Sequence, residues 1–281
     1  MTPLVSVILT TKNEARNINR CLDSVRGQTF QDFEILVIDN FSTDDTLDLA
    51  RKYTDRVFSL GPERSAQRNA GFQHARGKYV IYLDADMELT STVLSECLDA
   101  CQKNVTLVGL YIPERIAGNG FWIRVRDFER SFYDGTTIDA ARFMVREIVL
   151  GFGGFDATLC GPEDWDLDKQ LRARGHVATI RAPLYHHEGD FALGRYLKKK
   201  TYYSGSFAAY IAKWGADDPD VRRQLGAWYR FIGVYIEKGR WRRLLSRPDL
   251  AVGMYVLRFM VALAYMKVKW QQKRRPVGAL T

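Results

Sequence analysis

The sequence has few cysteines and few histidines, with four of each among its 281 residues. No two cysteines have the CxxC spacing of a zinc or dithiol redox site, so neither kind of site is expected. Cys97 and Cys101 have the spacing of neighbours on one helix face, and such thiols suit a reducing cytosol. Internal repeats and low-complexity segments are absent, and 46% of the residues are hydrophobic. These features exclude a disordered or collagen-like chain.

Two further signatures are missing. The stretch GFGGFD (151–156) lacks the GxGxxG spacing of a dinucleotide fingerprint and is more typical of a turn. The first residues, MTPLVSVILT, contain no basic region, long apolar run or small-residue cleavage site. We therefore expect a strand there and no secretory signal.

Charge is distributed unevenly along the chain, whose formal net charge is +8. Residues 1–194 hold 22 basic and 28 acidic residues, whereas residues 195–281 hold 19 and 5, a net charge of +14 for this tail. A basic tail on an acidic body indicates an anionic partner for the tail.

Short apolar or β-branched runs alternate with helical patterns over the first 112 residues. The expected strands are residues 5–9, 33–39, 56–60, 78–83 and 106–112. Amphipathic segments with apolar residues three and four positions apart separate them. This alternation predicts an α/β fold with a mostly parallel sheet and helices on both of its faces.

Polar residues gather where three of the expected strands end. Asp84 and Asp86 form a DxD triplet after the strand 78–83. The ends of the first two strands are followed by Thr10, Thr11, Asn13, Glu14, Asp39 and Asn40. Ligands of open α/β sheets bind at such strand ends, and a divalent cation between two carboxylates and a diphosphate would remove the repulsion between the carboxylates. Alternatively, Asp84 and Asp86 open a turn before a helix capped by Thr90 or Ser91.

Two long stretches carry a family resemblance. Residues 4–90, including VSVILTTKNEARNINRCLDSVRGQ and VIYLDADMEL, resemble the start of family 2 glycosyltransferases, inverting nucleotide-sugar enzymes of GT-A fold. The likeness resumes at GFGGFDATLCGPEDWDLDKQLRARG (151–175). It implies a GT-A catalytic domain over residues 1–194, with a nucleotide-sugar half (1–112) and an acceptor half (113–194). The charge and the helical patterns of the remaining residues indicate a basic helical extension (195–281) that associates with a membrane.

The resemblance also implies individual roles. Asp86 corresponds to the main metal ligand, and Asp84 to a ribose or metal contact. The expected nucleotide-binding residues are Thr10, Asn13, Glu14, Asp39, Asn40, Arg68 and Asp84. Asn40 stands where the family commonly has a second acid. Since an amide both donates and accepts hydrogen bonds, guanine is possible beside uracil, and a simple turn role for Asn40 stays open.

The stretch GPEDWDLDKQLRARG (161–175) is expected to form a helix. Asp166 and Asp168 would lie on its solvated face, with Asp168 paired to Arg172. In the family the ED pair, here Glu163 and Asp164, faces the donor sugar, and its Asp is the catalytic base. Direct displacement at an anomeric carbon requires such a base and inverts the configuration.

We therefore expect Asp164 to be the base, with Glu163 and Trp165 positioning the acceptor or donor sugar; for Trp165 a core role is equally open. A histidine beyond a late strand often completes the metal site of GT-A enzymes, and in LYHHEGDF (184–191) His186 fits better than His187. Imidazole suits Mn²⁺ better than Mg²⁺, although the metal can be either. An ordinary surface pair is the alternative.

The tail contains an apolar span, residues 250–266, interrupted only by Arg258. Its 17 residues are near the short limit for crossing a bilayer, and Arg258 would cost about 2.5–3.5 kcal/mol there. We expect helices that lie in the membrane interface on the cytoplasmic face, with Lys and Arg against anionic lipid. A membrane-spanning hairpin and a helix packed on the catalytic domain are the alternatives.

The expected function is transfer of a sugar from a nucleotide-diphosphate sugar, UDP-sugar favoured and GDP-sugar possible, to a hydroxyl of a glycan or polyprenyl-linked saccharide. A polyprenyl-phosphate acceptor is the first alternative, because an ionised phosphate needs no base. A nucleic-acid-binding protein would leave the acids at the strand ends unexplained, and a sugar nucleotidyltransferase would need a Gly-rich phosphate loop after the first strand. We therefore expect no nucleic-acid partner; the sequence does not determine the oligomeric state.

Overall fold

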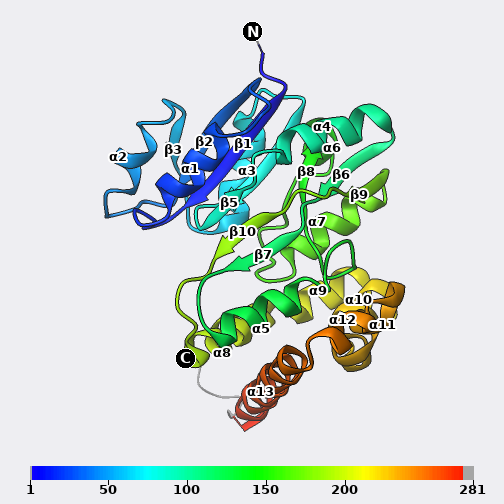
Figure 1. Ribbon diagram of the computed structural model, residues 1–281. Coiled ribbons are helices and arrows are strands. Elements are labelled where there is room, and N and C mark those ends of the chain that lie inside the picture. The colour runs from blue at the N-terminus through cyan, green and yellow to red at the C-terminus, as the bar shows by residue number, and fades with distance from the viewer. Residues whose placement is uncertain (1, 275–281) are drawn as a thin grey trace. The chain divides into compact units, whose positions relative to one another are not determined.

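In the computed structural model, residues 2–274 are described, apart from the side chains of residues 269 and 271–274 (Figure 1). The described residues form two compact units. Residues 2–117, 133–157 and 163–189 form the first, and residues 118–132, 158–162 and 190–274 the second. The second unit thus includes the tail expected from residue 195 and takes two further segments from the span expected to be catalytic.

The first unit contains a seven-stranded sheet with the order β3-β2-β1-β4-β8-β6-β9. Its strands are β1 (Val5–Thr11), β2 (Phe33–Asp39), β3 (Val57–Ser59), β4 (Tyr79–Asp84), β6 (Leu107–Tyr111), β8 (Ala141–Val145) and β9 (His176–Thr179). All neighbours are parallel except β8, which runs antiparallel to β4 and β6. The predicted α/β fold with a mostly parallel sheet is confirmed.

A second, three-stranded sheet has the order β5-β10-β7. Its strands are β5 (Met87–Leu89), β7 (Glu114–Ala117) and β10 (Leu184–His187). His186 on β10 is in register with Met87 on β5, and Leu184 with Glu114 on β7. This small sheet, which the sequence did not suggest, brings His186 beside the residues that follow β4.

Helices cover both faces of the large sheet (Figure 1). They are α1 (Ile18–Arg26), α2 (Thr46–Ala50), α3 (Arg64–His74), α4 (Val93–Lys103), α6 (Arg146–Gly151) and α7 (Glu163–Arg172). Successive side chains of a strand point to opposite faces, so Val7 of β1 packs in one core with α1 and α4, and Ile8 in the other with α3 and α7. Helix α3 packs closely, since a Cβ on Gly71 would lie 2.3 Å from Ile8 Cγ2.

The second unit is built from helices. They are α5 (Phe121–Arg130), α8 (Leu193–Tyr203), α9 (Phe207–Trp214), α10 (Pro219–Leu225), α11 (Val234–Ile236), α12 (Trp241–Ser246) and α13 (Pro248–Arg274), with short 3₁₀ or π segments at Ser204–Ser206, Tyr229–Gly233 and Glu237–Gly239. Helix α13 packs against α5, where a Cβ on Gly253 would lie 2.7 Å from Val125 Cγ2. Its stretch Pro248–Val268 is long and apolar enough to cross a membrane, and 33% of its most apolar part is buried within the protein.

Candidate functional site

The carboxyl ends of β1, β2 and β4 bring the predicted polar residues together. Thr10 is in register with Asp84, and its Oγ1 donates a hydrogen bond to Asp84 Oδ1 at 3.1 Å. The strand ends of β1 and β2 are joined by Gln67 of α3, whose buried amide donates to Thr11 O at 3.1 Å and to Ile38 O at 2.7 Å. Sequence reasoning missed Gln67, because a polar residue in an amphipathic helix is usually a solvated one.

The residues expected to hold the nucleotide are arranged around a turn after β2. Asp39 Oδ2 accepts from Ser42 N at 2.7 Å, and the Asn40 amide donates to Pro62 O at 2.6 Å. Asn13 Oδ1 accepts from Thr43 N at 2.8 Å. These bonds give Asp39, Asn40 and Asn13 a part in building the turn.

Glu14 lies near the DxD carboxylates, although it follows a different strand. Its Oε2 accepts from Asn17 Nδ2 at 2.8 Å. Burial raises the pKa of Glu14, the bond from Asn17 opposes this, and the charges of Asp86 and Asp84 raise the pKa further. Glu14 and the DxD triplet therefore share one electrostatic environment.

Arg68 occupies the centre of the site. Its guanidinium, on α3, donates from Nη2 to Asp84 Oδ1 at 3.0 Å and from Nη1 to Asp164 Oδ1 at 3.1 Å. Arg68 is only 1% exposed, and its charge lies 4.5 Å from the ring centre of Tyr82. Burial alone would lower the pKa of Arg68, but Asp84 and Asp164 outweigh it and raise the pKa. Asp84 in turn has a pKa far below its usual range, because Arg68, Arg64 and Arg142 overcome the effect of its burial.

The Glu163–Asp164–Trp165 cluster begins α7, where the helix dipole stabilises carboxylates. Asp164 Oδ1 also accepts from the Tyr82 hydroxyl at 3.1 Å, and the Asp164 side chain is 27% exposed. Burial and the neighbouring Asp164 raise the pKa of Glu163, against the lowering effect of Arg64 and Arg68. The indole of Trp165 donates to Ile138 O at 3.3 Å, and the Trp165 side chain is half-buried.

The solvated face expected for α7 is wrong for its two inner acids. Asp166 and Asp168 are buried, and Asp168 accepts from the Tyr111 hydroxyl of β6 as well as from Arg172 Nε at 2.8 Å. The predicted Asp168–Arg172 pair therefore exists, but it lies against the sheet. Sequence spacing could not reveal this because the phenol partner comes from a strand remote in sequence.

His186 and Asp86 face each other across the two small strands β5 and β10. His186 Nε2 lies 3.0 Å from Asp86 Oδ2, and His186 Nδ1 lies 3.1 Å from Glu114 Oε1. Burial would lower the pKa of His186, but the bonds to Asp86 and Glu114 raise it to about 10. His187 instead lies 2.7 Å from Glu88 Oε2.

Asp86 offers a fit for a divalent cation. Its second oxygen, Oδ1, is buried and has no hydrogen-bond partner among residues 2–274. Within that part of the chain, no three His, Cys, Asp or Glu side chains are already grouped as a metal site. An unpartnered carboxylate oxygen beside an imidazole nitrogen is nevertheless the donor set that Mn²⁺ accepts, so the residues present suit the predicted metal.

Sequence reasoning missed four further residues that surround the predicted ones. Tyr82 and Arg142 lie inside expected or actual strands, where the sequence suggests core packing, while Glu114 precedes Arg115 without a motif. Arg64 reaches Asp84 Oδ2 at 3.8 Å and Glu163 Oε1 at 3.4 Å. A possible signal was the pair of arginines four positions apart, Arg64 and Arg68, on one face of a helix.

Comparison with known proteins gives concordant results. Residues 6–155 match the family model described as Glycosyl transferase family 2. The chain is 38% identical over 93 residues to Glycosyltransferase AglE of Haloferax volcanii, a match that covers 30% of this chain and 31% of that protein. The curated relatives with which this chain aligns are covered over less than half of their length.

Solved structures show the same fold at low identity. The mannosyltransferase PcManGT from Pyrobaculum calidifontis, in complex with GDP-Man and Mn²⁺, superposes with a TM-score of 0.66 and 19% identity over 98% of this chain and 89% of that one. S. aureus TarS 1-349 in complex with UDP-GlcNAc superposes with a TM-score of 0.56 and 16% identity over 96% and 91%. The predicted GT-A fold is thereby confirmed.

Proposed function

Because the chain belongs to glycosyl transferase family 2, we propose that it transfers a sugar from a nucleoside-diphosphate sugar to a hydroxyl group, with inversion at the anomeric carbon. The observation that carries the proposal is the bridge from Arg68 to Asp84 and Asp164. It places the expected base close to Asp84 of the proposed donor site, and a direct displacement needs the base and the donor close together.

Asp164 is the proposed base. It would accept the proton of the acceptor hydroxyl while that oxygen attacks the anomeric carbon and the bond to the diphosphate breaks. Arg68 and Tyr82 both donate to Oδ1 of Asp164, which fixes the orientation of the carboxylate. Glu163 and Trp165, in the same helical turn, would position the reacting sugars. A single displacement gives an inverted product.

The proposed donor site is formed by the ends of β1, β2 and β4. Thr10, Asp39 and Asn40 would hold the base, while Asn13, Glu14, Arg68 and Asp84 would complete the nucleotide site. Asp86, Asp84 and His186 would hold Mn²⁺ or Mg²⁺, which when bound neutralises charge on the diphosphate leaving group. GDP-Man and UDP-GlcNAc each occur in a structure of this fold, which supports keeping both nucleotides as candidates.

The proposed acceptor is a glycan or a polyprenyl-linked saccharide, and the proposed site of action is the cytoplasmic face of a membrane. The tail, residues 195–281, would bind that surface through its net charge of +14. Anionic headgroups attract such segments, with each basic residue near the surface contributing about 1 kcal/mol. The apolar stretch in α13 supports the same location.

Calorimetric titration of the purified protein with UDP, GDP and CDP, with and without Mn²⁺, tests the donor site. We expect one nucleotide to bind in a metal-dependent manner and the binding to be lost in Asp86→Ala. Glu88→Gln, a change in the neighbouring His187 pair, is the control and should bind as wild type. Failure of a folded protein to bind any of the three nucleotides would contradict the proposal.

A further inference from the structure

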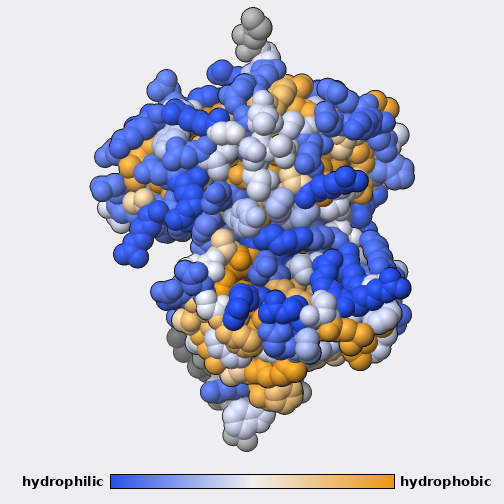
Figure 2. Space-filling view, viewed as in Figure 1, coloured by the Kyte–Doolittle hydropathy of each residue, from blue (hydrophilic) through white to orange (hydrophobic). Residues whose placement is uncertain are grey.

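The outer face of α13 carries a continuous apolar stripe. The exposed residues are Val252, Val256, Phe259, Leu263, Met266 and Trp270, which alternate in steps of four and three. This spacing places them along one side of a helix. In the space-filling view, hydrophobic residues lie open on the surface over α13 and its neighbouring helices (Figure 2).

The opposite face of α13 holds Arg258, the one charged residue of the apolar span 250–266. Leu250, Met254 and Leu257 are buried there, together with Arg258, whose Nη2 lies 2.9 Å from Glu129 Oε1 of α5. Both side chains of this ion pair are less than a tenth exposed. Arg258 therefore points away from the apolar stripe, and surrounding α13 with lipid on all sides would require this buried pair to break.

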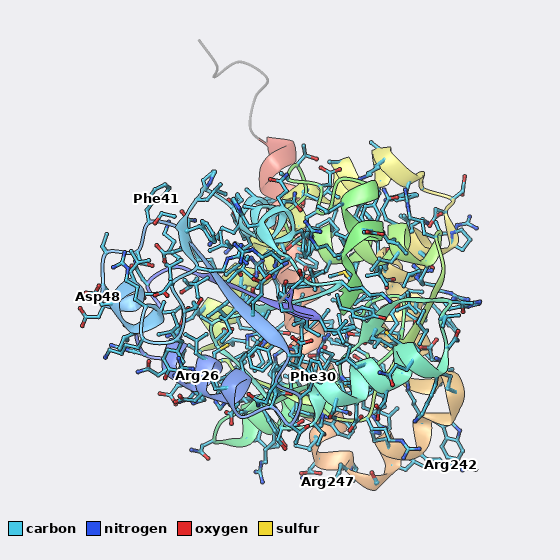
Figure 3. The ribbon with its side chains drawn as sticks, turned by 90° about the horizontal axis from the view of Figure 1, so that it is seen from above. Arg26, Phe30, Phe41, Asp48, Arg242 and Arg247 are labelled. Atoms are coloured by element: carbon cyan, nitrogen blue, oxygen red, sulfur yellow. The ribbon has the colours of Figure 1, made fainter. Side chains whose placement is uncertain are left out.

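The net charge of the tail favours an anionic bilayer as the partner of the stripe. A second copy of the chain would bring two tails of net charge +14 together, whereas an anionic bilayer neutralises them. Arg242 on α12 and Arg247 just before α13 are exposed (Figure 3). We propose that the stripe from Val252 to Trp270 lies in the plane of an anionic bilayer without crossing it, an inference that rests on the proposed membrane attachment and specifies its face.

Sedimentation of the full chain with phosphatidylcholine vesicles, with and without phosphatidylserine, tests this face. Val252→Glu and Phe259→Glu are expected to reduce the bound fraction by at least about tenfold. The matched control is Val105→Glu, since Val105 is an exposed valine of the first unit; it should bind anionic vesicles as wild type. Size-exclusion chromatography should give one elution volume for all four proteins.

The possible outcomes distinguish the proposed membrane attachment from the proposal that the apolar stripe is the contact face. If wild type binds no vesicle, the proposed membrane attachment fails. If wild type and both stripe variants bind anionic vesicles equally, attachment stands and the stripe is not the contact. A stripe variant that changes the oligomeric state would identify a second copy as the partner, and a chain that resists alkaline carbonate extraction from cell membranes would be a spanning protein; either result overturns the inference.

His186 contacts a second carboxylate through its other ring nitrogen, Nδ1. Glu114 of β7 uses its two oxygens differently: Oε1 lies 3.1 Å from His186 Nδ1, and Oε2 accepts from Arg142 Nη2 at 2.9 Å. Glu114 and Arg142 are both buried. The imidazole is thereby held with Nε2 directed at Asp86, on the side where a metal would lie.

The geometry points to Glu114 as a positioning residue for the proposed metal ligand His186. Carboxylates that bind the far nitrogen of a ligating histidine fix the ring and its tautomer, and their loss lowers metal affinity by about 10–100-fold. Arg142 fixes the carboxylate in turn. This inference rests on the proposed metal site and adds a residue that does not itself touch the metal.

Mn²⁺ affinity, measured from the electron paramagnetic resonance signal of free Mn²⁺ with GDP or UDP present, tests the role of Glu114. Glu114→Gln keeps hydrogen-bond capacity toward Arg142 but removes the charge, and we expect about tenfold weaker Mn²⁺ binding. Glu88→Gln, in the matching His187–Glu88 pair, should have no effect. In a His186→Gln background, Glu114→Gln should cause no further loss, because its effect passes through the imidazole.

The variant Asp86→Ala distinguishes the proposed metal site from the proposed role of Glu114. If Asp86→Ala leaves Mn²⁺ affinity unchanged, the proposed metal site is wrong. If Asp86→Ala abolishes binding but Glu114→Gln equals wild type, the site stands and the role of Glu114 is wrong. An equal loss from Glu114→Gln with and without His186 would show a general structural effect and would also overturn the inference.

Discussion

Asp84 and Asp164 accept hydrogen bonds from two different nitrogens of one guanidinium, that of Arg68. One acid ends β4 and the other lies in the first turn of α7, so a single buried cation sets the distance between two motifs that are far apart in the sequence. Without the cation the two carboxylates would repel each other. The geometry of the expected base thus depends on a residue outside both acidic motifs.

Replacement of Arg68 by methionine should destabilise the protein and disorder the site. Breaking a buried ion pair by removing one partner costs about 3–5 kcal/mol, and we expect a value near 3 kcal/mol because both carboxylates are partly exposed. Urea unfolding measures the loss. Arg51→Met, which removes an exposed pair with Asp48, should leave the unfolding curve unchanged. Equal effects of the two substitutions would show that the Arg68 bridge is energetically unimportant.

Asp164→Asn should abolish transfer while leaving nucleotide binding intact. Loss of a general base lowers turnover by about 10²–10⁴-fold, whereas the residues expected to hold the nucleotide are unchanged. The measurement pairs a transfer assay, using the sugar of the nucleotide that binds, with calorimetry. Substantial remaining activity in Asp164→Asn would instead favour an acceptor that is already ionised, such as a polyprenyl phosphate.

Phe41→Gly should stabilise the protein. Phe41 has φ 51°, a left-handed conformation that costs about 1–2 kcal/mol for a residue with a Cβ, and the residue is 65% exposed. Glycine loses more backbone entropy on folding, which offsets part of the relieved strain. We therefore expect a gain of about 0.5–1 kcal/mol in the free energy of unfolding. Phe41→Ala keeps the conformation but removes the ring, so it serves as the control. A glycine variant less stable than the alanine variant would contradict the assignment of strain.

Two glycine-to-alanine changes in helices should have opposite effects. Gly71→Ala would place a Cβ 2.3 Å from Ile8 Cγ2, and overpacking of this kind costs about 1–3 kcal/mol. Gly151→Ala, at the end of α6, meets no atom within 4 Å and should be neutral or gain up to about 1 kcal/mol. Thermal unfolding of the two variants provides the comparison. A stabilised Gly71→Ala would mean that α3 and β1 pack more loosely than described.

Much of the first unit could be predicted because local pattern and tertiary position agree there. The five expected strands exist, and Asp84 and Asp164 lie at a strand end and a helix start as the motifs indicated. Tyr82 and Glu114 could not be predicted, since a strand residue with a buried polar partner has the same local pattern as one that packs in a core. Their roles depend on α7 and β10, which are paired with them only by the fold.

The second unit was less predictable for the same reason. Its extent depends on α5, whose segment follows the nucleotide half in sequence but packs with α13 near the other end of the chain. The close approach at Gly253 and the ion pair between Arg258 and Glu129 are contacts between residues far apart in sequence, and no periodicity in either helix reveals them. From sequence alone, Arg258 in an apolar span indicates a cost of membrane insertion, whereas in the fold it pairs with the buried Glu129.

The interrupted path of the chain through the second unit makes the tail depend on α5, a helix far from it in sequence. Helix α5 lies within residues 6–155, which match the family model, whereas its packing partner α13 lies near the other end of the chain. A truncated form ending before α13 would expose Val125 to water and remove Arg258, one of the cations that pair with Glu129. Replacing the tail alone by that of a relative would therefore break its packing with α5. A chimeric protein that functions needs the α5 of the same relative as well.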